Sequence, residues 1–402
     1  MGVDENRFSL TCAACGRTYG PRKRVWRCEC GGLLDLNPPA PQLVRDTFTA
    51  LRSTGARREA HGLWRYAPLL PIAHPDEVRA YGEGLTPLTR ARAAGHAARA
   101  AKGSAALGPL LKLDYLFPSG SFKDRGSAVM LNRLRELDVT DLVEDSSGNA
   151  GASVATYSAR NGLRCAIFAP ASASRGKLAQ VAQAGARLVA VPGPREKATE
   201  EAEEAAKAGA YYAGHNRNPF FLAGMKTWAY EVYEQLGGRA PGDCVFPVGG
   251  GSMLIGAHRG FRDLLAAGLI SRLPRLWAAQ TDSCDPVARA IAEGLDHLPP
   301  VDKRPTVAEG IALVQPPRGA KILAAIRETG GGAVTVPEGD VLPAAGELAR
   351  LGFFVEPTSV AAWAGCTRLA TTGRFPDPAD VVVTLTGSGL KFRDWPVVAA
   401  TP

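Results

Sequence analysis

Short apolar runs alternate with amphipathic, alanine-rich segments along most of the chain beyond about residue 60. The runs are bounded by turn residues and predict buried strands, and the segments between them predict helices. This alternation is typical of an open α/β fold with mainly parallel strands, in which ligands bind at the carboxyl ends of the strands. Strands are expected at residues 110–113, 165–169, 188–191, 244–248, 276–279 and 381–385, and helices at 150–160, 177–184, 197–207 and 253–267.

The first 36 residues carry four of the eight cysteines of the chain. Cys12, Cys15, Cys28 and Cys30 form two short pairs, and four thiolates from two turns match the tetrahedral coordination of Zn²⁺. Short cysteine pairs indicate metal ligands rather than disulfides in a reducing compartment. The second pair has a one-residue spacer where zinc ribbons usually have two, so four reduced thiols without a metal are the alternative. We expect a closed, structural zinc site in a ribbon-like module spanning residues 1–36.

Basic and aromatic residues are interleaved in the same module, between residues 17 and 27. Taken alone, such a stretch could bind nucleic acid. More than 350 residues of different character follow it, which favours a small solvated cap on a larger enzyme. Binding to nucleic acid is therefore not expected. Three prolines between residues 38 and 41 predict a short stiff linker after the module.

The composition is that of a globular protein. Of 402 residues, 46% are hydrophobic and 21% are charged, which excludes a chain that is disordered throughout. No apolar stretch approaches the roughly 20 residues that span a bilayer, and the first thirty residues lack a signal-peptide core. We therefore expect a cytoplasmic protein without a membrane partner. The net charge of +8 is dispersed and weakly favours a phosphorylated ligand over nucleic acid.

Four polar, glycine-rich segments stand at predicted strand-to-helix junctions and carry the candidate chemistry. In the first, residues 118–126, Lys123 opens a helix. An ammonium group at a helix N-terminus is opposed by the helix dipole, so this position favours a neutral amine that can form a Schiff base. The alternative is a solvated lysine at a frayed helix start.

The other three segments offer sites for anions and a strand-end hydroxyl. Residues 146–153 place hydroxyls, an amide and free backbone N–H groups at a helix start, which suits a carboxylate or phenolate but also an ordinary cap. Residues 247–253 contain three glycines that permit close approach of a phosphate, although a glycine-rich turn alone is a weak signal. Residues 385–391 place Thr386 at the end of a valine-rich strand. Together, these segments are what pyridoxal phosphate requires.

The same segments resemble those of threonine synthase. The resemblance covers residues 80–392, and many threonine synthases also begin with a cysteine-rich ribbon ending in Cys-Gly-Gly-Leu, as at residues 30–33 here. It implies an α/β, fold-type II pyridoxal-phosphate enzyme of the tryptophan synthase β type. The implied organisation is a ribbon at residues 1–36, a large cofactor-binding domain from 37–125 and 236–402, and a small domain at 126–235. The matching segments, in the family's order, are residues 82–88, 119–126, 146–149, 247–253, 356–359 and 386–391.

Roles for individual residues follow from the resemblance. Lys123 would hold the cofactor covalently and, once released, move protons at the α and β carbons of the substrate. Ser146, Ser147 and adjacent backbone amides would bind the substrate carboxylate. The other implied cofactor ligands are Asn149 at the ring oxygen, Gly249, Gly250, Gly251, Ser252 and Met253 at the phosphate, and Thr386 at the ring nitrogen. The candidates near the substrate phosphate are Arg125, Lys177, Asn216 and Asn218.

The resemblance implies a lyase that converts O-phospho-L-homoserine and water to L-threonine and phosphate, and it implies a homodimer. The departures from the family lie mostly near the substrate. The family's Asn-Pro-Thr reads Phe-Pro-Ser at residues 117–119, and its Ile-Gly-Asn-Pro reads Leu-Val-Gln-Pro at 313–316. Cofactor use is therefore a firmer prediction than the identity of the substrate.

Three alternatives remain open from the sequence. A related enzyme could perform β-replacement or β-elimination, for example a cysteate-synthase-like enzyme acting on O-phosphoserine. A Ser/Thr dehydratase is the second alternative, because residues 308–312 resemble a dehydratase segment. The third is a non-catalytic protein that joins a zinc ribbon to a degenerate enzyme fold. The presence of Lys123, Asn149 and Thr386 together argues against degeneration.

Overall fold

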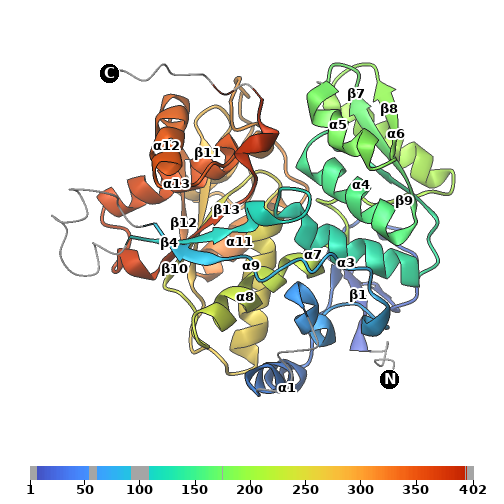
Figure 1. Cartoon of the computed structure of the whole chain (residues 1–402), viewed down its shortest axis with the longest axis horizontal. Helices are drawn as coiled ribbons and strands as arrows, with labels where there is room; N and C mark the ends of the chain where they lie inside the picture. The colour runs from blue at the N-terminus through green and yellow to red at the C-terminus, as the bar shows by residue number, and fades with distance from the viewer. Residues whose placement is uncertain (1–6, 54–60, 92–107, 174, 394, 396–402) are drawn as a thin grey trace.

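The computed structural model describes residues 7–53, 61–91, 108–173, 175–393 and 395. Its strands form one six-stranded, one four-stranded and one three-stranded sheet. Figure 1 shows the elements of the four-stranded sheet gathered on one side, in green, and those of the six-stranded sheet on the other, mostly in orange and red. None of the described helices has the length and apolar character needed to cross a lipid bilayer.

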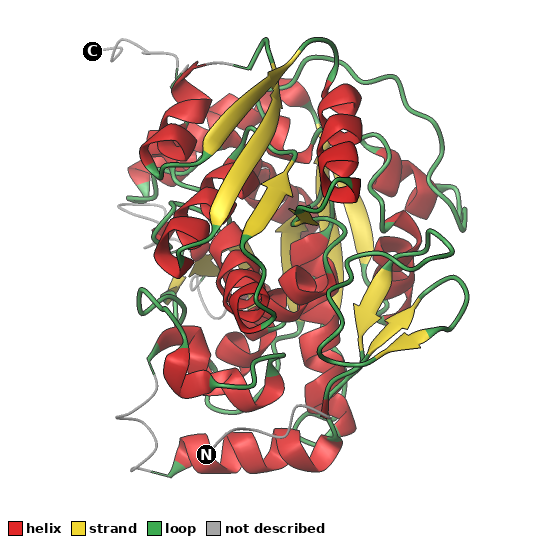
Figure 2. Ribbon diagram, turned by 90° about the vertical axis from the view of Figure 1, so that its right-hand side faces the viewer, coloured by secondary structure: helices red, strands yellow, loops and turns green. Residues whose placement is uncertain are grey.

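The six-stranded sheet has the order β12-β11-β10-β13-β5-β4, and only β4 runs antiparallel to its neighbour. Successive side chains point to opposite faces of a strand, and helices cover both faces, as Figure 2 also shows. Val245 and Val383 pack with α12 and α13, whereas Cys244 and Val382 pack in the cluster that contains α9 and α11. The strands are β4 (Leu88–Arg90), β5 (Leu110–Leu113), β10 (Asp243–Pro247), β11 (Arg275–Thr281), β12 (Gly332–Val336) and β13 (Val381–Leu385). The helices are α8 (Thr227–Gln235), α9 (Ser252–Ala266), α10 (Pro286–Ala292), α11 (Gly319–Glu328), α12 (Glu338–Arg350) and α13 (Pro357–Thr371).

The four-stranded sheet is parallel throughout, in the order β8-β7-β6-β9. Leu142 and Ile167 pack with α4 on one face, and Val143 and Phe168 pack with α6 on the other. Every strand and helix expected from the sequence coincides with an observed element to within two residues. The strands are β6 (Asp141–Glu144), β7 (Arg164–Pro170), β8 (Arg187–Val191) and β9 (Tyr211–Tyr212), and the helices are α4 (Asn149–Asn161), α5 (Arg175–Gln183) and α6 (Arg195–Lys207).

Two further helices, α3 (Lys123–Glu136) and α7 (Pro219–Met225), pack tightly against each other. A Cβ atom at Gly126 would lie only 2.6 Å from the ring of Phe221, so a glycine is needed for this close approach. The helix α3 also packs on α4, while α8 packs on α9 of the larger sheet. This packing fixes the start of α3, where Lys123 lies, between the two larger sheets.

The N-terminal module folds as the three-stranded sheet β2-β1-β3, followed by α1. Asp35 and Leu34 are among the residues that attach it to the rest of the chain. The guanidinium of Arg318, which is 3% exposed, donates to Asp35 Oδ1 at 2.8 Å and to the carbonyl of Leu34 at 2.9 Å. The elements of the module are β1 (Leu10–Cys12), β2 (Thr18–Tyr19) and β3 (Leu34–Leu36), with α1 at Pro41–Arg52.

Candidate active site

Lys123 and Thr386 lie close together because the segment before α3 pairs with the segment after β13. The backbone N–H of Phe122 donates to the carbonyl of Thr386 at 2.8 Å, and Ser121 forms an antiparallel bridge with Gly387. Two residues that are 263 positions apart in the sequence are thereby held at the carboxyl end of the large sheet. This is the edge at which ligands bind in open α/β folds.

Glu356 links Thr386 to Asn149, at the start of α4. The side-chain amide of Asn149 donates to Glu356 Oε2 at 2.8 Å, and the Thr386 hydroxyl donates to Glu356 Oε1 at 3.4 Å. The hydroxyl of Ser359 fixes the turn by accepting from the backbone N–H groups of Thr386 and Gly387 at 2.8 and 3.0 Å. The three residues predicted to surround the cofactor ring therefore converge on one place. The role of Glu356 had no signal in the sequence beyond its position in a matching segment.

The environment of Lys123 favours a neutral amine. Burial lowers the pKa of its ammonium group to about 8, although the carboxylates of Glu144 and Glu356 act against this shift. Burial also raises the pKa of Glu356. A lysine with a pKa near 8 has more neutral amine at neutral pH than an ordinary lysine, as a residue that forms a Schiff base requires.

The glycine loop between β10 and α9 forms a cup with little room for side chains. A Cβ atom at Gly250 would lie 2.1 Å from Asn216 Oδ1, and one at Gly249 would lie 2.7 Å from Ile311 Cα. Gly251 adopts a φ of 74° and caps α9, whose first N–H groups point out of the helix. Asn216 Oδ1 is buried without a hydrogen-bond partner, so this acceptor is available to a donor group of a ligand. Free backbone N–H groups at a helix start fit a phosphate group.

Ser146 and Ser147 lie in the loop from β6 to α4, next to Asn149. Ser146 is buried, and its hydroxyl accepts from the N–H of Gly148 at 3.3 Å. Ser147 is half-buried. The first N–H groups of α4 provide an anion site of the kind predicted for the substrate carboxylate.

A cavity of about 940 Å³ borders the cup. Asn216 lines the cavity and also contacts the cup at Gly250. The short helix η6 (Glu309–Ile311) contacts the cup at Gly249 through Ile311. Residues 313–315, which depart from the threonine synthase pattern, line the cavity. Its wall also contains His215, which bonds to the buried carboxylate of Glu144. The sequence analysis missed this pair, because the two residues are 71 positions apart and belong to no shared motif.

Comparison with known proteins identifies the family. A family model described as pyridoxal-phosphate dependent enzyme matches residues 80–387. The threonine synthase of Methanocaldococcus jannaschii is 33% identical over 385 residues, which cover 95% of this chain and 93% of that protein. The chain belongs to the threonine synthase family of pyridoxal-phosphate-dependent enzymes. Another member, the threonine synthase of Methanosarcina acetivorans, is 31% identical over 387 residues, or 96% of this chain and 92% of that protein.

Solved structures of lower identity confirm the predicted fold-type II architecture. A threonine deaminase from T.th. has a TM-score of 0.64 and 24% identity, and the match covers 89% of this chain and all of that one. Maize serine racemase has a TM-score of 0.63 and 18% identity, with 76% of this chain and 88% of that one covered. At such identities these likenesses concern the fold alone.

The residues predicted near the substrate phosphate of a threonine synthase do not all reach the cavity. Arg125 is fully buried, and its N–H groups all donate inside the protein, chiefly to Asp114 and Glu231 at 2.7–2.8 Å. Asn218 caps α7 by accepting from the N–H groups of Phe220 and Phe221. Lys177 lies in α5, but its side chain falls outside the described part of the structure. Of the four, Asn216 lines the cavity.

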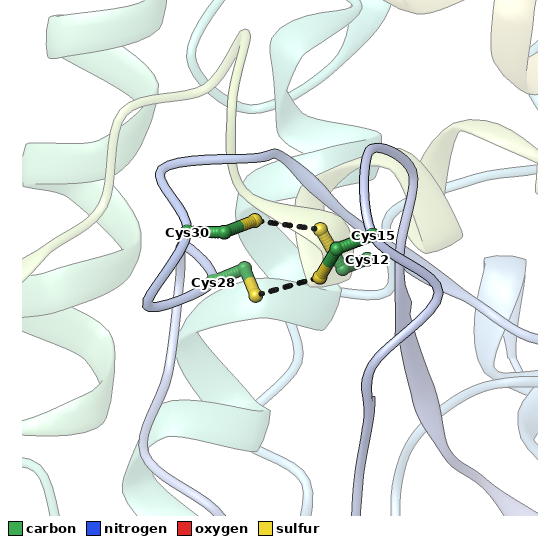
Figure 3. Close-up of side chains that lie close together, drawn as sticks. All are labelled: Cys12, Cys15, Cys28 and Cys30. Atoms are coloured by element: carbon green, nitrogen blue, oxygen red, sulfur yellow. Dashed lines mark hydrogen bonds between the residues drawn. The ribbon is translucent and has the colours of Figure 1, made fainter.

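The four N-terminal cysteines converge as predicted for metal ligands. Their Sγ atoms all lie within 4.8 Å of one another (Figure 3). The closest pairs are Cys12 with Cys30 and Cys15 with Cys28, each at 3.6 Å. The hydroxyl of Tyr19 donates to Cys28 Sγ at 3.1 Å and lowers the pKa of this thiol to about 6, which favours the thiolate that binds metal. The cluster can hold a metal ion, and its donor set fits Zn²⁺.

Proposed function

We propose that this protein is a threonine synthase that converts O-phospho-L-homoserine and water to L-threonine and phosphate. The observation that carries the proposal is the convergence of Lys123, Asn149, Thr386 and the glycine cup at one sheet edge, in a chain that belongs to the threonine synthase family. The substrate is a small phosphorylated amino acid. A cytoplasmic location, expected from the sequence, and a homodimer, implied by the resemblance, are part of the same proposal.

The residues of the site can hold pyridoxal phosphate. The N–H groups of residues 249–253 would bind its phosphate, the Asn149 amide its ring oxygen, and the Thr386 hydroxyl its ring nitrogen. When bound, the cofactor supplies an electron sink that stabilises negative charge at the substrate's α carbon. Because a hydroxyl does not force the ring nitrogen to be protonated, Thr386 moderates that sink, which suits elimination and replacement.

The chain's own residues then direct the reaction. Ser146, Ser147 and the first N–H groups of α4 orient the substrate by its carboxylate. The amine of Lys123, with a pKa of about 8, accepts a proton from the α carbon and, once it has given that proton up, accepts one from the β carbon. Hydrogen is returned to the α and γ carbons, so the protons on carbon balance. The loop at residues 309–317 lines the cavity beside the cup, where the substrate's phosphate would lie.

We also propose that Cys12, Cys15, Cys28 and Cys30 bind one structural Zn²⁺. The convergence of the four sulfurs supports this assignment. A site with four protein ligands has no open position for chemistry, so the ion would stabilise the ribbon.

The function is tested by incubating the holoenzyme with O-phospho-L-homoserine and following phosphate and threonine together. Equal amounts of both products are expected, and Lys123→Ala should form neither. If protein that carries the cofactor forms neither product, the threonine synthase proposal is wrong. In that case the departures at residues 117–119 and 313–316 have changed the pocket, and O-phosphoserine is the next substrate to try.

A further inference from the structure

Glu144 and His215 form a buried acid–imidazole pair at the carboxyl edge of the four-stranded sheet. Glu144 is the last residue of β6, and His215 follows the adjacent strand β9. His215 Nδ1 and Glu144 Oε1 are 2.8 Å apart, and the backbone N–H of His215 donates to Glu144 Oε2 at 3.2 Å. The Glu144 side chain has no exposed surface and that of His215 is 8% exposed. The carboxylate therefore fixes both the backbone and the ring of His215.

The other ring nitrogen faces the cavity. His215 lines the cavity, and among the described residues its Nε2 has no hydrogen-bond partner. Nε2 is not fully buried, so it is accessible from the cavity. The ring packs edge-on against Phe221, with their centroids 5.8 Å apart, and Phe221 is itself held against α3 at Gly126. The ring is therefore held in one orientation, with Nε2 open to the cavity.

The pair and Lys123 share one electrostatic environment. Burial lowers the pKa of His215, and the charges of Lys123 and Arg195 lower it further. Burial raises the pKa of Glu144, and the neighbouring carboxylate of Asp145 adds to this effect, whereas Lys123 and Arg195 oppose it. The charges of Lys123, Glu144 and His215 are thus close enough to influence one another. Asn216, the residue after His215, touches the glycine cup. His215 therefore lies on the cavity wall, next in sequence to a residue that touches the glycine cup.

This arrangement allows Nε2 to exchange a proton. When Glu144 is a carboxylate that accepts a hydrogen bond from Nδ1–H, Nε2 carries a lone pair and is a base. When the pair binds one more proton, Nε2 carries hydrogen and is an acid, and Glu144 stabilises the resulting charge. A carboxylate that orients an imidazole in this way is a recurrent device of acid–base catalysis.

We propose that His215 is a second catalytic acid–base residue of this enzyme and that Glu144 positions it. The proposal rests on the proposed function. As the bond between Cγ and the phosphate oxygen breaks, its electron pair leaves on that oxygen, which takes the proton from Nε2. Later, a water oxygen bonds to Cβ, and the proton released from that water returns to Nε2. One proton thus leaves with phosphate and one is recovered from water, while Lys123 handles the protons on carbon.

A matched control is available in the same chain. His258, on α9, is a second histidine with little exposure, and its Nε2 lies 3.1 Å from Glu328 Oε2. His258 is not among the residues that line the cavity. The Glu328 side chain is 43% exposed, so the two pairs share a mostly buried histidine and a glutamate partner but not the burial of that partner. If a histidine–glutamate pair only stabilises the fold, His215→Gln and His258→Gln should both leave the chemistry unchanged.

The test separates proton exchange at carbon from phosphate release. Holoenzymes of the wild type, His215→Gln and His258→Gln are given O-phospho-L-homoserine in D₂O, and α-hydrogen exchange and phosphate are followed together. His215→Gln should keep its cofactor absorbance and its exchange to within a few fold, because Lys123 performs that step. Its phosphate release should fall by about 10²- to 10⁴-fold, the usual contribution of a general acid–base group. His258→Gln should behave like the wild type.

Two further variants test the orientation of the ring. Glu144→Gln should lower phosphate release less than His215→Gln, because the imidazole remains. Added imidazole should restore part of the phosphate release of His215→Ala, which a purely structural role would not permit. If the wild type and His215→Gln release phosphate equally fast, the role of His215 is overturned but the proposed function is not. A wild type that releases no phosphate would overturn the proposed function and, with it, this role.

Discussion

At the residue scale, the reactivity of the site depends on the amine of Lys123. Burial lowers the pKa of that amine to about 8, so it is mostly protonated below this pH and mostly neutral above it. Only the neutral amine can attack the cofactor's aldehyde. The rate at which apoprotein combines with pyridoxal phosphate should therefore rise about tenfold per pH unit below 8 and level off above it.

The measurement is the appearance of imine absorbance after pyridoxal phosphate is mixed with apoprotein over a range of pH. Lys123→Ala, which should give no imine absorbance at any pH, is the control. A rate that continues to rise up to pH 10, as for an ordinary lysine, would contradict the role of burial.

Some residues of the site could be predicted from the sequence, and others could not. Lys123, Asn149 and Thr386 stand in motifs and were predicted together, and the structure brings them together. Arg125 looked suitable because it is near Lys123 in the sequence. Arg125 lies two residues after Lys123 on the same helix, which rotates its direction by about 200°. Its side chain therefore points into the core, away from the face that carries Lys123. Glu356 acts through a contact with Asn149, 207 positions away, which no local pattern predicts.

At the element scale, the glycine loop before α9 should be intolerant of side chains. In Gly250→Ala, the added methyl group would collide with Asn216 Oδ1, at 2.1 Å, and displace the amide from the phosphate cup. The dissociation constant for pyridoxal phosphate should rise at least about tenfold, a loss of about 1.4 kcal/mol of binding free energy.

Titration of apoprotein with pyridoxal phosphate, followed by absorbance, measures this constant. Gly339→Ala is the matched control, because Gly339 lies in α12 and a Cβ atom there would meet nothing within 4 Å. The control should bind the cofactor like the wild type. Equal dissociation constants for Gly250→Ala and Gly339→Ala would mean that the loop is not the phosphate cup.

Elements were predictable where the sequence has an apolar run bounded by turn residues. β10 and β13 are buried at every position and were predicted. β9 has only two residues, and β12 is an edge strand with three half-buried positions, so neither carries a strong pattern. These strands form because neighbouring strands supply their hydrogen bonds, which is tertiary information.

At the scale of the whole molecule, the ribbon is connected to the active site through Arg318. Its guanidinium donates to Asp35 and Leu34 of the ribbon and also to the carbonyls of Asn216 and Arg217, at 3.2 and 2.8 Å. Asp35 is further paired with Arg259 at 2.5 Å. The sequence suggested a ribbon separated by a proline linker, and it could not show this contact because the two partners are more than 280 positions apart.

Removal of metal from the ribbon should therefore weaken cofactor binding at a distance. A structural zinc site supplies folding free energy to its module, so a ribbon without zinc should lose the order of residues 34–35. Arg318 would then lack its partners in the ribbon, and the loop that carries Asn216 would be held less firmly against the cup. Freshly purified protein should contain one zinc per chain, and a chelator should lower both its melting temperature and its affinity for pyridoxal phosphate. Added zinc should restore both, but not in Cys30→Ser; zinc loss without any change in cofactor affinity would show that the ribbon is independent of the site.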